Sequence, residues 1–150
     1  MRAFAVTVLV VALIGVPIVA AQSALSFAIE LSAGTIAAAV PFYTVLYTTT
    51  ETPQPYHASL FERTSTKDIA LGLVVPPIAA GLAVACAGSL FGVTGPAAAL
   101  AAIIGASVSE VFAFQLWQLD VPEWVKSISV PIITSLGATI AFNRQARPSH

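Results

Sequence analysis

Charged residues are the first class that this sequence lacks. Asp, Glu, Lys and Arg together make up 9% of the 150 residues, whereas a soluble domain carries about 25%. Six basic and seven acidic residues leave a net charge of −1, and no basic stripe is present, which excludes a nucleic-acid-binding surface. Low charge combined with 57% hydrophobic residues also excludes intrinsic disorder. The remaining class is a small integral membrane protein, with the lipid bilayer as its surroundings.

Residues that carry metal or covalent chemistry are also few. Cys86 is the only cysteine, so the chain has no internal disulfide and no cysteine-rich metal site. His57 lies in a polar stretch and His150 in the polar tail, so no histidine is available in an apolar segment to bind haem. Nucleotide-binding glycine loops and a Gly-x-Ser-x-Gly elbow are missing. We therefore expect no enzymatic activity, no catalytic or cofactor-binding residue and no metal site.

Long apolar runs are what the sequence has in abundance. A helix needs about 20 mostly apolar residues to cross a membrane. The run that ends at 142 is short for a span, so a re-entrant or interfacial helix is its alternative. We predict an all-α integral membrane protein with a single helical membrane domain over 22–150. Its spans are expected at 24–47, 69–93, 97–119 and 125–142, with a polar loop over 48–68.

The first 21 residues have the pattern of a secretory signal peptide. A basic residue, Arg2, precedes an apolar run that ends near Pro17, and Val19 and Ala21 fit the small-residue positions of a cleavage site before Gln22. The alternative is an uncleaved first helix, which gives five spans instead of four. The signal-like segment suggests a bacterial inner or plasma membrane as the location.

Small residues recur at helical spacing in two neighbouring runs, separated only by Thr94-Gly95-Pro96. A linker of this length predicts a tight antiparallel hairpin over 69–119. Membrane helices associate through close backbone contact, which small side chains permit. We expect the two small-residue faces to pack against each other; the alternative is a docking face for another copy or another subunit. The candidate packing residues are Gly81, Ala85, Gly88 and Gly92, and Ala98, Ala102, Gly105 and Ser109.

Two carboxylates, Glu30 and Glu110, lie within apolar runs. An ionisable side chain at the centre of a span costs about 2.5–3.5 kcal/mol on insertion scales, so both should face the bundle interior or a partner. Neither has a basic residue at helical spacing. Three interpretations stay open. In the first, each glutamate is a neutral hydrogen-bonded acid that holds helices together. In the second, each binds a group on another subunit or a lipid headgroup. In the third, the two glutamates form a proton or cation relay.

The relay interpretation has a layout argument. A glycine-rich helix, a tight turn and a second helix with a mid-span carboxylate resemble the proteolipid subunits of rotary ATPases in layout alone. The connecting loop of that family is polar and charged, unlike Thr94-Gly95-Pro96, so no function is carried over. By elimination, we expect a non-catalytic structural or accessory subunit of a membrane complex. A homo-oligomeric proton- or ion-conducting protein that uses Glu110, supported by Glu30, is the alternative.

Aromatic residues gather near expected span ends. Lys and Arg are slightly more frequent in the 48–68 and 120–126 loops than in the rest of the polar segments, which places these loops inside the cell. Tryptophan and tyrosine are typical of headgroup boundaries. The candidate interface aromatics on this inner boundary are Tyr43, Tyr47, Trp117 and Trp124.

Overall fold

The computed structural model describes residues 24–49, 66–115 and 122–146, which form four helices. They are α2 (Ala24–Thr49), α4 (Thr66–Ser89), α5 (Pro96–Phe114) and α6 (Glu123–Ala146). The predicted signal segment lies outside the described residues, as does most of the 48–68 loop. All four helices are long and apolar enough to cross a membrane. Within the described residues, the prediction of an all-helical fold with four candidate membrane spans is therefore confirmed.

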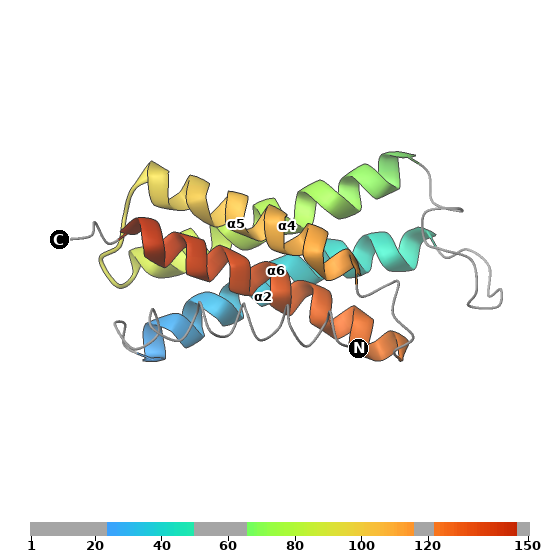
Figure 1. The fold of residues 1–150 in the computed structure, drawn as a ribbon, viewed down its shortest axis with the longest axis horizontal. Helices are drawn as coiled ribbons and strands as arrows, with labels where there is room; N and C mark the ends of the chain where they lie inside the picture. Colours follow the sequence, from blue (N-terminus) through green and yellow to red (C-terminus); the bar gives the residue numbers. More distant parts are fainter. Residues whose placement is uncertain (1–23, 50–65, 116–121, 147–150) are drawn as a thin grey trace.

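The four helices run in alternating directions along one bundle (Figure 1). The start of α2, the end of α4, the start of α5 and the end of α6 lie at one end of the bundle. Consecutive helices pack side by side, α6 also packs on α2, and α4 touches α6 across the bundle. The helix expected at 125–142 is longer than predicted, because Trp124–Ala146 offers 23 residues that are apolar enough to span.

Prolines occur inside three helices, at Pro41 in α2, Pro76 and Pro77 in α4, and Pro131 in α6. A proline has no backbone N–H, so the carbonyl four residues earlier loses its helical donor. Membrane helices tolerate this when a neighbouring group satisfies the freed carbonyl. Pro76 and Pro77 are almost fully buried, so the affected part of α4 packs inside the bundle.

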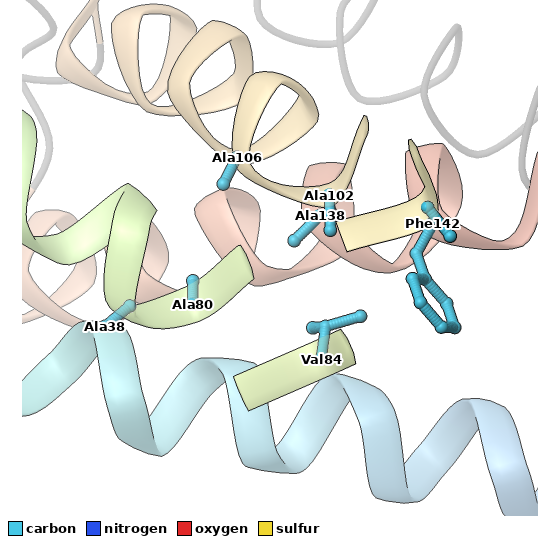
Figure 2. Packing of buried hydrophobic residues seen from close by; sticks show 8 residues of the cluster. Ala38, Ala80, Val84, Ala102, Ala106, Ala138 and Phe142 are labelled. Atoms are coloured by element: carbon cyan, nitrogen blue, oxygen red, sulfur yellow. The ribbon is translucent and has the colours of Figure 1, made fainter. Parts of the chain in front are cut away.

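Alanine dominates the core of the bundle (Figure 2). One cluster of eight buried residues draws on all four helices, and six of its members are alanines. Small side chains bring helix backbones close together, which is the main source of packing energy between helices in lipid. The cluster consists of Ala38, Ala80, Val84, Ala98, Ala102, Ala106, Ala138 and Phe142.

Large apolar side chains face outward instead. Leu100, Ile104, Val108 and Val111 of α5 are each more than half exposed, and they lie on the side opposite its buried alanines. In water such a surface would be unstable, whereas in a bilayer it contacts acyl chains at no cost. This inverted distribution of large and small residues is consistent with a multi-pass membrane protein.

Candidate functional site

A buried polar contact in the core joins α2 to α6. The Asn143 Nδ2 atom donates a hydrogen bond to Glu30 Oε2 over 2.6 Å and another to the Thr139 carbonyl over 2.8 Å. Glu30 is completely buried, and Asn143 is only 2% exposed. A buried carboxyl group needs such a partner, because an unpaired polar group costs several kcal/mol in lipid. Glu30 therefore acts as a connector between two helices.

A second polar contact joins the same two helices, at the residue after Glu30 on α2 and eight residues before Asn143 on α6. The Ser135 hydroxyl donates to the Leu31 carbonyl over 2.7 Å. The approach depends on Gly34, because a β-carbon there would collide with Ser135 Oγ and come within 2.8 Å of Val84 Cγ2. Glycine at 34 thus makes room for the hydrogen bond that the serine forms with the turn before it.

A third contact lies near the opposite end of the α2–α6 interface. The Tyr43 hydroxyl donates to the Ser127 carbonyl over 3.2 Å. Ser127 lies four residues before Pro131, so the proline removes the helical donor of this carbonyl. The tyrosine supplies a donor in its place. Tyr43 of α2 therefore compensates for the hydrogen bond that Pro131 removes from α6.

We expect Tyr43→Phe to destabilise the bundle by about 1 kcal/mol, the usual net value of one hydrogen bond. The same change in a Pro131→Ala background should cost close to nothing, because alanine restores a backbone donor to Ser127. Chemical unfolding of the four proteins in detergent gives the coupling energy. Equal losses in both backgrounds would show that the tyrosine does not compensate for the proline.

Glu110 of α5 differs from Glu30 in its surroundings. Its side chain is completely buried, and no described residue forms a hydrogen bond with Oε1 or Oε2. The Thr134 hydroxyl of α6 is the one other buried side-chain group in the described ranges without a hydrogen-bond partner. Native interiors rarely leave such groups unsatisfied, and those that are usually have a specific explanation.

The packing of α5 on α6 places Glu110 and Thr134 at the same level of the bundle. Gly137 packs between Gly105 and Ser109. Since the two helices are antiparallel (Figure 1), moving one turn back along α6 from Gly137 to Thr134 corresponds to moving forward along α5 to Glu110. Both residues therefore lie between two apolar clusters, one containing Ala106 and Ala138 and the other Ala113 and Val130.

The predicted small-residue face of α4 is divided between two neighbours. Gly81 packs on α5, where a β-carbon would come within 2.7 Å of the Ile103 backbone. Gly88 instead faces the Phe142 ring of α6. Ala85 is half-buried beside the alanine core.

On α5, Ala98 and Ala102 are buried in that core. Gly105 and Ser109 pack on Gly137 of α6, so they do not face α4. The small residues thus serve three helix pairs, α4–α5, α4–α6 and α5–α6, instead of one α4–α5 zipper, because α6 packs against both helices.

Gly92 is not a packing residue, and the helix expected to reach 93 ends at Ser89. Gly92 has φ of 79°, and a β-carbon there would meet nothing within 4 Å. The Val93 N–H donates to the Gly88 carbonyl and the Gly92 N–H to the Ser89 carbonyl, which is the Schellman motif that ends many helices. Gly92 therefore serves helix termination, whereas Gly88 packs on Phe142, so the two glycines do not form one contact face.

Three of the four candidate interface aromatics belong to described helix ends on one side of the bundle. Tyr43 and Trp124 are at the same end of the bundle, at the end of α2 and the start of α6 (Figure 1). Trp124 is 67% exposed, as expected for a headgroup contact. Tyr47 lies in the last turn of α2, and Trp117 falls outside the described residues.

The polar residues of α6 form a buried face that was not predicted from the sequence. Ser135, Thr139 and Asn143 recur every four residues, which places them on one helical face. All three are buried, and two of them contact α2. The buried face could have been predicted from this spacing, since polar residues that recur at the helical period in an apolar run indicate a face turned away from lipid.

Among the described residues, no group of three His, Cys, Asp or Glu side chains is arranged to hold a metal ion. Glu110 and Thr134 therefore form the one candidate site whose polar atoms the described structure leaves unpaired. Comparison of the chain with protein-family models, with curated proteins and with solved structures gave no match.

Proposed function

We propose that the protein handles protons or other small cations in a membrane, with Glu110 as the binding group. The observation that carries the proposal is complete burial of this carboxyl group with both oxygens unpaired. Ionisable side chains inside membranes are costly, and they commonly mark ion pathways and proton relays. A purely structural carboxyl group would be expected to have a partner, as Glu30 has in Asn143.

The burial of Glu110 favours a small ion over a group from another protein chain. Its side chain has no exposed surface, so a partner residue would reach it only if helices separated. A proton or small cation needs a far smaller opening. For the same reason, a lipid headgroup is a poor candidate ligand for this carboxyl group.

Replacement of Glu110 by glutamine tests the proposal directly. Glutamine keeps the shape of the side chain and removes its ability to bind a proton or a cation. In proteoliposomes with a pH-sensitive dye, we expect the wild-type protein to dissipate an imposed ion gradient and Glu110→Gln to lose at least about tenfold of that rate, equivalent to about 1.4 kcal/mol in the barrier.

The matched control is Glu30→Gln, which keeps an acceptor for Asn143 in the same kind of environment. It should retain flux, because Glu30 is proposed to connect helices only. Wild-type flux in Glu110→Gln, with the protein still folded, would contradict the proposal. Measuring both with Na⁺ and K⁺ gradients as well as pH gradients covers the alternative ions.

An accessory subunit of a membrane complex is the second candidate function. It is favoured by the exposed row Leu100, Ile104 and Val108 on α5, which is suited to another apolar helix as well as to lipid. This proposal places the protein in a bacterial inner or plasma membrane, following its signal-like segment. Native mass spectrometry of gently extracted protein discriminates: other chains bound to it favour the accessory role, and a closed homo-oligomer favours conduction.

A further inference from the structure

The site at Glu110 also indicates which ion it binds, an inference that rests on the proposed function and refines it. Three buried side-chain atoms are without a hydrogen-bond partner in the described ranges: Oε1 and Oε2 of Glu110 and Oγ1 of Thr134. They belong to two helices that meet at this level, through the contact of Gly137 with Ser109. Among the described side chains, these three buried oxygens are the ones left unpaired for a ligand.

A metal cation would be poorly served by this set. Divalent cations such as Ca²⁺ and Mg²⁺ take about six or more oxygen ligands. The residues one turn from Glu110 on α5 are Ala106 and Ala113, and those one turn from Thr134 on α6 are Val130 and Ala138. None of these side chains can coordinate a metal. From the described side chains left unpaired, a metal ion here would gain three oxygen ligands, about half of what it needs.

A proton requires far fewer ligands than a metal cation, because it binds to a single carboxylate oxygen. We infer that the ligand is a proton bound to Glu110, with the Thr134 hydroxyl as a positioning group for the resulting carboxyl. Binding forms one O–H bond on a carboxylate oxygen and removes its charge; release breaks that bond and returns the proton to water. The threonine hydroxyl both donates and accepts hydrogen bonds. On protonation it turns to hydrogen-bond the carboxyl group, since neither group has another partner among the described residues.

Other titratable groups lie away from this level of the bundle. On α2, Glu30 is bound to Asn143, nine residues beyond Thr134 along α6, and Tyr43 is bound to Ser127 near the other end. On α6, Lys126 precedes Thr134 by eight residues, which is about 12 Å of helix.

The remaining helix brings no closer charge. Cys86 of α4 is exposed, and it lies beyond Gly81, which packs at the level of Ile103. Among the side chains that the structure describes, Glu110 therefore has no charged neighbour within a turn of its level. The neighbouring polar group that can respond to protonation of Glu110 is therefore the Thr134 hydroxyl.

Infrared spectroscopy of the full chain in liposomes tests the inference. A protonated carboxyl gives a C=O stretch separate from that of a carboxylate. We expect a protonated-carboxyl band at neutral pH whose Glu110 part disappears in Glu110→Gln. In Glu30→Gln this part should remain, and only a contribution from Glu30 itself should be lost. Exchanging K⁺ for Na⁺, or adding Mg²⁺, should leave the Glu110 band unchanged.

The role of threonine has its own variants. Thr134→Val keeps the shape and removes the hydroxyl, so the Glu110 band should move to the frequency of a carboxyl without a hydrogen bond. Thr134→Ser should keep the wild-type position. A loss of folding in either variant would be visible in the amide bands, and the serine variant then serves as the test.

Each alternative result overturns the inference. The absence of a Glu110-dependent band would mean a permanent carboxylate, and loss of the band on adding Na⁺ or Mg²⁺ would mean a metal ligand. An unshifted band in Thr134→Val would remove the threonine from the site. Failure of the proposed function is distinguishable, because a protein without ion flux would still show the Glu110 band and its shift.

Discussion

Gly105→Leu is expected to break the packing of α5 on α6. Any β-carbon at this position would collide with the Gly137 carbonyl oxygen and come within 2.5 Å of the Ala141 β-carbon. Backbone atoms cannot move aside as a flexible side chain can, so the two helices must separate. We expect a loss of at least about 3 kcal/mol, the upper part of the range for overpacked cores. Thermal unfolding in mild detergent, followed by circular dichroism, measures it.

The control is Ala97→Leu, which adds the same kind of bulk to an exposed position in the first turn of the same helix. It should unfold like the wild-type protein. Gly137→Ala provides an independent check from the other side of the contact, since its β-carbon would collide with Ser109 Oγ. Wild-type stability in Gly105→Leu would mean that α5 and α6 are not in backbone contact.

Asn143→Leu is the second change with a large expected effect. It removes the amide that donates to Glu30 over 2.6 Å inside the core. Losing one partner of a buried hydrogen bond costs about 1–3 kcal/mol, and more where a charged group is involved. We expect a loss of about 3 kcal/mol, measured by the same unfolding experiment.

A double-mutant cycle separates the hydrogen bond from simple changes of shape. If the contact is what matters, adding Glu30→Leu to Asn143→Leu should recover much of the lost stability, because two apolar side chains leave no polar group buried. Independent, additive losses would show that Glu30 and Asn143 do not stabilise the bundle through each other.

Helix positions were predictable from the sequence because the determinants are local. Apolar runs long enough to span a membrane define α2, α4, α5 and α6, and the structure agrees within a few residues at most ends. The helix predicted to reach 93 ends earlier, at Ser89, and the sequence around Gly92 also contains a local indication of this end. Gly92 and Gly95 precede Pro96, a combination typical of a helix stop followed by a helix start, and both glycines adopt positive φ.

The pairing of helix faces could not be predicted in the same way. Gly88 faces Phe142, which is more than 50 residues away in sequence, and no periodicity within α4 distinguishes α5 from α6 as its neighbour. The two glutamates show the same limit. Glu30 and Glu110 look equivalent within their own helices. They differ because Asn143 donates a hydrogen bond to Glu30, whereas Glu110 has no hydrogen-bond partner among the described residues.

The polar face of α6 has a consequence for biosynthesis. Ser135 and Asn143 are satisfied by α2, a helix that the ribosome produces about a hundred residues earlier. When α6 leaves the translocon, its acceptors and donors already have a docking surface in the bilayer. A nascent chain in which α2 is inverted or delayed would present this row of hydroxyl and amide groups to lipid, where an unpaired polar group costs several kcal/mol.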